Sequence, residues 1–369
     1  MAIIQYKVLV GATYATMTNE LANVQSVTLN IGRQHQLNQY SANTGSVVIR
    51  VPGLYFAPSP FFVTGTWISI SVRQAGGTYY ELFVGKINNV TLNYGVKYQS
   101  SVGPADYATL SLEGSFAQWG RVQGKSYAMP AGTWDDQVGD AFTETGLSAP
   151  VFAGGSTNLA ATTVSGSWGD WLSKSLLTVN GRMIDWGDYI GLYDQYFRRG
   201  FNEYGGFSDT TNDATNHTYT NINFSSLADN YYTQIRVAPE GLAAQTVQTG
   251  SAPYRTYEVN TLNATTSDAL AYANRLLTTY STTNLKLESL TCHLPSQIGG
   301  IPAYGANLVS EVVSVIFRGT TYYGIIEGMT WSGTPDNAFA TFYLSAGTSG
   351  LTYNSTIQYD QFGALYDGY

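Results

Sequence analysis

The chain has 369 residues and a formal net charge of −8, and only 11% of its residues are Asp, Glu, Lys or Arg, against about 25% in typical soluble domains. Its 17 basic residues form no run longer than Arg198–Arg199, so we expect no sequence-specific nucleic-acid binding. A single cysteine, Cys292, excludes an intrachain disulfide and a multi-cysteine metal site. No apolar run approaches the roughly 18 residues of a membrane span. The first residues lack a secretory signal, which predicts a soluble protein made in the cytoplasm.

The polar surface of such a chain has to be built from uncharged residues. The sequence contains 29 Tyr and 39 Gly and is rich in Ser, Thr, Asn and Gln. Tyr and Thr favour half-buried β-strands, whereas Gly and Asn favour turns. Interface cores are likewise depleted in Lys, Glu and Asp and enriched in Tyr. The composition therefore predicts a β-rich protein whose surface is partly covered by neighbouring subunits.

Residues 1–112 show short strands with alternating apolar and polar residues. The runs SVTLNI, GSVVIRV, WISISV, YYELFVG and INNVTLNYG have this period of two. Gly76–Gly77 separates two of them and is typical of a hairpin turn. Several strands at this spacing predict an antiparallel barrel or sandwich.

Residues 113–226 have a different pattern, which predicts a small inserted α+β domain. One helix is expected after Thr133, which can cap it, and before Gly146, which can end it. A second helix is expected from Ser167, followed by a tight turn at Asn180–Gly181 and a pair of strands. The polar segment 198–220 is long enough for a functional or mobile loop.

Strands resume in 227–348, interrupted by a helix–strand insert at 262–303. The helix is expected to start at a cap, Thr266 or Ser267, and to carry one apolar stripe. We assign to that stripe Leu270, Ala273, Leu277 and Tyr280. A closing meander turns at Arg318–Gly319, and the polar, aromatic tail 349–369 is expected to lie across a partner.

No arrangement of residues indicates an enzyme, a cofactor site or a metal site. Asp135–Asp136 falls in the first turn of a helix, where acids meet the helix dipole favourably. His35, His217 and His293 lack metal-binding spacing. Cys292 and His293 are neighbours in a strand and point to opposite faces, which favours a buried cysteine. Only one weak calcium pattern remains, without the EF-hand spacing, and it consists of Asp209, Asn212, Asp213 and Asn216.

Five segments, in order, resemble the minor tail proteins of siphophages. In the first, SVTLNIGRQHQLNQYSANTGSVVIRV, a strand ends at Gly32–Arg33, a Leu-x-x-aromatic step follows at Leu37–Tyr40, and a strand opens at Gly45. The others are ELFVGKINNVTLNY, the helix-then-strand block SGSWGDWLSKSLLTVNGRMIDWGDYIGLYD, the stretch from YRTYEVN to LTCHL, and the meander EVVSVIFRGTTYYGIIEGMTWSGTPDNAFATFYLSAG. The chain departs from the family at Val51–Pro52–Gly53, where the family has an Asn/Asp-rich turn, and in its long loop.

The resemblance implies a mainly β fold with α+β insertions, similar to a baseplate hub. Such a hub has two related antiparallel β-barrels with inserted small α/β domains and assembles as a trimer. The expected division is a first barrel at 1–112, an inserted domain at 113–226, a second barrel at 227–348 with the insert 262–303, and a C-terminal tail at 349–369.

The implied role is that of a structural virion protein of a phage tail tip, made in the host cytoplasm. A homotrimeric hub would close the tail tube, gate DNA ejection, adapt a sixfold tail to a threefold tip and anchor fibres for host attachment. The implied partners are further copies of the chain, the distal tail protein ring, the tape measure protein and central fibre or receptor-binding proteins. Two alternatives stay open. One is a glycan-binding adhesin that uses the loop at 200–219, and the other is a cell-wall hydrolase that uses some of Glu113, Asp188 and Glu203.

We expect an assembly interface to involve Gly32, Arg33, Tyr40, Phe83 and Arg318. Gly32 is expected to permit a bend or bulge at the end of its strand. Arg33 is expected to form a fixed hydrogen-bonding fork inside a subunit or between subunits. We therefore predict that Arg33→Ala impairs assembly and affects no turnover.

Overall fold

The structure of the chain is a computed structural model. It describes residues 4–34, 37–51, 63–93, 106–147, 151–153, 157–194, 206–212, 216–225, 231–281, 286–297, 309 and 311–346. These residues are mainly β-strand, with four α-helices and two short 3₁₀ helices among them, at Tyr14–Thr16 and Leu294–Ser296. The high content of Tyr, Thr and Gly thus gives the β-rich chain that the composition predicts. No helix in this part of the chain is long and apolar enough to cross a membrane.

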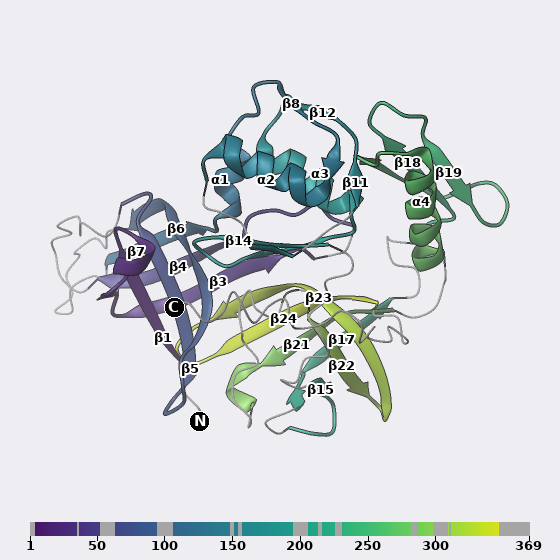
Figure 1. The fold of residues 1–369 in the computed structure, drawn as a ribbon. Helices are drawn as coiled ribbons and strands as arrows, with labels where there is room; N and C mark the ends of the chain where they lie inside the picture. Colours follow the sequence, from purple (N-terminus) through teal and green to yellow (C-terminus); the bar gives the residue numbers. More distant parts are fainter. Residues whose placement is uncertain are drawn as a thin grey trace, which may run out of the picture.

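The N-terminal half of the main sheet is a run of antiparallel strands (Figure 1, purple and blue). Its order is β3-β4-β7-β6-β5-β1-β2. The strands are β1 (Ile4–Gly11), β2 (Asn19–Glu20), β3 (Val24–Gly32), β4 (Thr44–Val51), β5 (Trp67–Gln74), β6 (Tyr80–Asn93) and β7 (Asp106–Glu113). The turn between β5 and β6 contains Gly76 with φ +84°, so the predicted glycine hairpin is confirmed. Alternate residues of β3, namely Val27, Leu29 and Ile31, are buried, as its period of two requires.

The C-terminal half of the main sheet comes from two separate stretches of the chain. Its strands are β15 (Gly206–Ser208), β16 (Asn216–Thr218), β17 (Asn221–Ser225), β21 (Lys286–His293), β22 (Val312–Phe317), β23 (Thr320–Gly333) and β24 (Ala338–Ala346). The tight turn between β22 and β23 is at Arg318–Gly319, as the sequence predicts, and both residues have positive φ.

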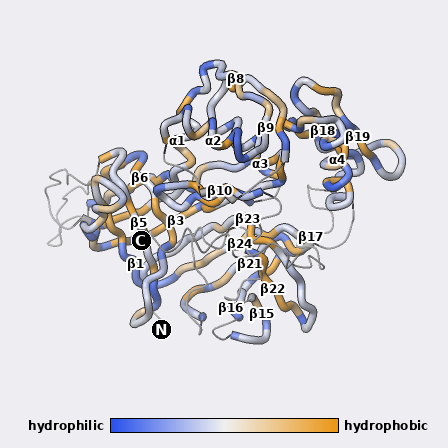
Figure 2. Tube along the Cα trace, in the orientation of Figure 1, coloured by the Kyte–Doolittle hydropathy of each residue, from blue (hydrophilic) through white to orange (hydrophobic). Residues whose placement is uncertain are grey.

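Strand β23 joins the two halves into one sheet of 14 strands. Its last six residues pair with β3, its first residues pair with β22, and β24 pairs along most of its length. A single apolar core accordingly runs from Val8 of β1 to Phe342 of β24. Figure 2 shows apolar stretches along strands of both halves of the sheet. The two halves are therefore parts of one packed unit.

Two separate, purely antiparallel barrels are not confirmed. In the described residues, the strand pairs form an open path from β2 to β16 with a branch at β23 that runs through β24 and β21 to β17, and no closed barrel results. The pairs β15–β16 and β15–β22 are parallel. Alternating polarity identifies which face of a strand is buried, but it contains no information on whether the last strand returns to the first.

A helical body lies over the junction of the two halves (Figure 1, teal). It contains α1 (Phe116–Arg121), α2 (Trp134–Thr145) and α3 (Trp168–Thr178). Its strands are β8 (Tyr127–Met129), β9 (Gly132–Thr133), β10 (Val151–Ala153), β11 (Asn158–Leu159), β12 (Thr162–Val164), β13 (Arg182–Asp185) and β14 (Ile190–Tyr193). The predicted caps are confirmed: Thr133 accepts a hydrogen bond from the N–H of Asp136, and Gly146 ends α2 in the left-handed conformation. Ser167 caps α3 in the same way.

A smaller body consists of one helix and three strands (Figure 1, green). Helix α4 (Thr266–Tyr280) packs against β18 (Gln234–Pro239) and β19 (Gln245–Gln248), and β20 (Thr256–Thr261) pairs with β18. The helix exists where predicted, but Thr265 caps it, one residue before the expected cap. Its buried stripe also differs, because Leu270 is 40% exposed. The buried face instead contains Ala269, Tyr272, Ala273, Leu276 and Tyr280.

The predicted domain boundaries differ from this organisation at two places. Strands β15, β16 and β17 fall within the predicted insert 113–226, yet β15 pairs with β22 and β17 with β21 of the main sheet. Strand β21 falls within the predicted insert 262–303, yet it pairs with β24 of the same sheet. The helix–strand insert is instead the α4 body within 231–281. Strand partners far apart in sequence leave no local signal, which explains both differences. The predicted tail 349–369 lies outside the described residues.

Candidate functional site

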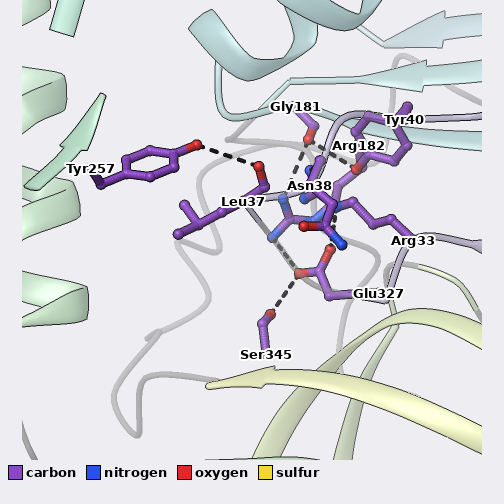
Figure 3. A network of polar contacts seen from close by, with 9 residues as sticks. All are labelled: Arg33, Leu37, Asn38, Tyr40, Gly181, Arg182, Tyr257, Glu327 and Ser345. Atoms are coloured by element: carbon purple, nitrogen blue, oxygen red, sulfur yellow. Dashed lines mark hydrogen bonds and ion pairs between the residues drawn. The ribbon is translucent and has the colours of Figure 1, made fainter. Parts of the chain in front are cut away.

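Three buried charged side chains meet where the main sheet, the helical body and the α4 body come together (Figure 3). Nε of Arg33, which follows β3, lies 2.8 Å from Oε2 of Glu327 in β23. Nη2 of Arg182, the first residue of β13, lies 3.5 Å from Oε1 of the same carboxylate. The hydroxyl of Ser345 in β24 donates to that oxygen at 2.6 Å. We call these four residues the ionic junction.

The backbone around Gly32 explains why Glu327 points inward. Gly32 has φ +70°, and a Cβ on it would lie 2.5 Å from the carbonyl oxygen of Glu327. The pairing of β23 with β24 shifts by one residue between Ile326 and Gly328, so that Glu327 sits in a bulge. The N–H of Arg33 donates to the Glu327 carbonyl at 2.9 Å. The predicted bend at Gly32 is therefore present, and it brings Arg33 beside the bulged Glu327.

The segment between β3 and β4 ties the ionic junction to both smaller bodies. The Arg33 guanidinium stacks 4.3 Å from the ring centre of Tyr40, and its Nη1 donates to the carbonyl of Asn38 at 3.2 Å. The Tyr40 hydroxyl donates to the carbonyl of Gly181, just before β13, at 3.3 Å. The Tyr257 hydroxyl, from β20, donates to the carbonyl of Leu37 at 3.4 Å. These contacts join the end of β3 and the segment 37–40 to the start of β13 and to β20.

The electrostatics of the ionic junction favour an ionised carboxylate. Burial acts to raise the pKa of Glu327, but Arg182, Arg33 and the Ser345 hydrogen bond outweigh it and lower this pKa to about 2. Burial also raises the pKa of the neighbouring Tyr280 well above its usual value. Glu327 is therefore charged at neutral pH and is poorly suited to proton transfer. Its chemical role is to hold two guanidinium groups in fixed positions.

A second buried carboxylate anchors the other end of β13. Asp185 accepts hydrogen bonds from the N–H groups of Ser115 and Phe116, at the start of α1. The backbone carbonyl of Asp185 accepts a bond from the Asn43 side chain at 3.1 Å. Burial raises the pKa of Asp185 to about 6, although these backbone donors lower it. A Cβ on Gly114 would lie 2.0 Å from this carboxylate, so a larger residue there would displace the Asp185 side chain.

The residues expected at an assembly interface fall into two groups. Arg33, Tyr40 and Phe83 are 5%, 5% and 3% exposed and are covered by the chain itself. In the single chain these three side chains leave little surface for another subunit, and their place at an assembly interface stays a prediction. The hydrogen bonds expected of the Arg33 guanidinium, inside a subunit or between subunits, form inside the subunit, to Glu327 and to the carbonyl of Asn38. Gly32 shapes the ionic junction, and Arg318 is exposed in a turn whose N–H donates to Asp209.

Sequence reasoning missed Glu327 and Arg182 as the partners of Arg33. Glu327 lies 294 positions from Arg33, and no local pattern links them. One signal was present: Glu327 interrupts the otherwise uncharged strand TTYYGIIEGMTWSG. A lone acid in such a strand needs a buried cation.

The weak calcium pattern and the isolated acids fall partly outside the described residues. Among the residues that the structure describes, no group of three or more His, Cys, Asp or Glu side chains comes together. Asp209 accepts from Arg318, and the side chain of Asn212 donates to the carbonyl of Ser296. Glu113 pairs with Arg121. His35, Asp213 and Glu203 lie outside the described residues. Cys292 is buried, as expected.

The comparisons with known proteins agree with a phage tail fold. No protein-family model and no curated protein match this sequence. Among solved structures, the chain is similar to the 43 kDa tail protein of prophage MuSo2 from Shewanella oneidensis, with 10% identity, a TM-score of 0.63 and coverage of 93% of this chain and 98% of that one. It is also similar to a tail protein from Neisseria meningitidis MC58, with 13% identity, a TM-score of 0.62 and coverage of 93% and 96%.

A third similar structure is the Escherichia coli c3393 protein, a component of the type VI secretion system. It shares 12% identity with a TM-score of 0.52 and coverage of 89% of this chain and 74% of that one. Its structure is reported as similar to tail proteins of bacteriophage T4. These matches span nearly the whole chain and include both the sheet and its insertions. The chain therefore has the fold of phage tail and baseplate-like proteins.

Proposed function

We propose that this chain is a structural virion protein of a phage tail tip, where three copies form a hub. The observation that carries the proposal is the similarity of the fold, over nine-tenths of the chain, to two phage tail proteins. The hub closes the tail tube, adapts the sixfold tail to a threefold tip and anchors fibre or receptor-binding proteins. It contacts the distal tail protein ring on one side and the tape measure protein within the tube.

The ionic junction and the segment 37–40 beside it support this role physically. A hub has to transmit force between neighbours without deforming, and these two features together tie the main sheet to both smaller bodies. Low charge supports it as well, because faces that become buried between subunits favour Tyr and uncharged polar residues. Arg318, exposed in the β22–β23 turn, is the one expected interface residue that we propose to contact a neighbouring subunit directly.

Two measurements test the proposal. Mass photometry of the purified chain is expected to show a trimer, and electron microscopy of virions with a labelled antibody is expected to place the chain at the tail tip. Arg33→Ala is expected to reduce trimer formation indirectly, by loosening the ionic junction, whereas Arg318→Ala is expected to do so without lowering the thermal stability of the monomer. A stable monomer at micromolar concentration together with no antibody at the tail tip would refute the proposal.

A further inference from the structure

A polar cleft opens beside the ionic junction, between the end of β3 and strand β23. Its volume is about 220 Å³, below the 300–1,000 Å³ of a typical drug-sized site, so it suits one small ring. One wall consists of Gln34, Asn38, Gln39 and Ser41, and the other comes from β3, β23 and β24.

The side chains that line the cleft are almost all neutral donors and acceptors. Four carboxamides and two hydroxyl groups face it, and they belong to Asn30, Gln34, Asn38, Gln39, Ser41 and Thr330. Most of these residues are exposed. Arg33 is the one charged residue of the lining that the structure describes, and its guanidinium is already committed to Glu327 and to the carbonyl of Asn38. The cleft therefore offers hydrogen-bond donors and acceptors, but its one cation is already paired and no charged group of the described lining remains to bind an ionic ligand.

Neutral saccharides match this chemistry. Each sugar hydroxyl donates and accepts a hydrogen bond, and a carboxamide provides an acceptor oxygen and two donor hydrogens in one plane. A phosphate or carboxylate ligand would need a cation that is free to bind it. A single sugar ring also fits the size of the cleft. Aromatic rings often complete such sites, and Tyr343 lies in the lining, where its hydroxyl interacts with Thr330 at 3.2 Å.

The cleft has a fixed wall, and a polar surface continues from its lining. Buried Tyr40 and the bond from Arg33 to Asn38 hold the segment 37–40 in place, so little ordering is needed on binding. In the lining, Thr330 lies opposite Asn30 on β3 and opposite Thr341 on β24. In the next row Ser332 lies opposite Thr28. These cross-strand rows continue the uncharged polar surface, which gives a longer saccharide a path out of the cleft.

We infer that this cleft binds a neutral oligosaccharide, with one ring held by Asn38 and Gln39. This site is distinct from the loop at 200–219 and does not depend on the proposed hub function. The affinity of a single site lined by amides and hydroxyls is expected to be weak, and several copies in an assembly would increase it by avidity.

The experiment uses the full chain and a glycan array that contains neutral and acidic oligosaccharides. Neutral ligands are expected to bind, and the affinity of the best one, measured by calorimetry, is expected to change less than about twofold between roughly 0.05 and 0.5 M salt, because no ion pair is screened. The double variant Asn38→Ala/Gln39→Ala is expected to weaken binding at least about tenfold, which corresponds to about 1.4 kcal/mol.

A matched control separates the cleft from the rest of the sheet. Asn89→Ala/Thr91→Ala removes two exposed polar side chains from β6 and is expected to leave binding unchanged. Thermal unfolding of both double variants is expected to match the wild type, because all four side chains are exposed. Binding of acidic glycans alone, no binding of neutral glycans at millimolar concentration, or equal binding by the cleft variant and the wild type would each overturn the inference. A polar peptide that binds the cleft with an affinity that added neutral sugars do not change would also overturn the inference.

Discussion

Replacing Glu327 with Gln is the sharpest test of the ionic junction. The substitution keeps the size of the side chain but removes the charge that two buried guanidinium groups share. Glu327 and Arg33 have side chains only 1% and 3% exposed, so water cannot compensate for the loss. We expect the folded state to lose a large part of its stability at neutral pH.

The magnitude follows from two independent arguments. The pKa of Glu327 falls from 4.5 to about 2 on folding, and about 2.5 units at 1.36 kcal/mol each gives about 3 kcal/mol. Removing one partner of a buried ion pair typically costs about 3–5 kcal/mol. For a chain of this length, about 3 kcal/mol corresponds to a fall in the melting temperature of roughly 4 °C.

The assay is urea unfolding at pH 7, followed by tryptophan fluorescence. Trp331 is fully buried in the strand that contains Glu327, and it contributes to a fluorescence signal that comes from 7 tryptophans in total. The matched control is Glu258→Gln, which breaks the pair with Arg236 at the surface, where the side chains are 53% and 42% exposed. That control is expected to cost less than about 1 kcal/mol.

The pH dependence provides a second readout. Because folding lowers the pKa of Glu327, its contribution is fully present above pH 4.5 and is lost as the pH falls through about 2. The stability difference between wild type and Glu327→Gln is therefore expected to narrow over that range. A cost at pH 7 no larger than that of Glu258→Gln, or a difference that stays constant down to pH 2, would refute the reasoning.

Two further predictions concern the same region. Folding raises the pKa of Asp185 from 3.8 to about 6, so its contribution to the stability of the fold is present below pH 3.8 and is lost as the pH rises through 6. As the pH falls from 6 to 4, the stability of the wild type relative to Asp185→Asn is therefore expected to increase by up to about 3 kcal/mol. Urea titrations at several pH values check this, and a flat difference would contradict it. Gly32→Ala places alanine at a positive φ that is unfavourable for it and adds a Cβ 2.5 Å from the Glu327 carbonyl oxygen. Gly76→Ala also places alanine at a positive φ, +84°, but the added Cβ meets no atom within 4 Å. We expect Gly76→Ala to cost about 1 kcal/mol and Gly32→Ala distinctly more; equal melting temperatures would show that the close approach at Gly32 is easily relieved.

Local signals predicted the helices and turns well. Thr133 and Gly146 mark the two ends of α2, and both could be predicted because an N-cap and a left-handed C-terminal residue act within one turn of the helix. The stripe of α4 was harder to predict, since Leu270 and Ala269 are adjacent and only tertiary packing decides which of them is buried.

The candidate site could be predicted only from one side. Arg33 stood out because charge is scarce in this chain, and a bend at Gly32 follows from glycine in a strand. Its partner Glu327 could not be identified, because the pairing of β3 with β23 brings together residues about 300 positions apart. The parallel pairing of β15 with β22 was missed for the same reason.

The unequal charge count of the ionic junction constrains the order in which its residues can change over generations. Loss of Arg182 leaves Arg33 and Glu327 as a neutral pair, joined at 2.8 Å. If Glu327 is lost first, the two guanidinium groups remain buried without their carboxylate. This step is strongly destabilising for a marginally stable chain. Lineages of this protein are therefore expected to exchange Arg182 early, and to exchange Glu327 only together with Arg33 or after it.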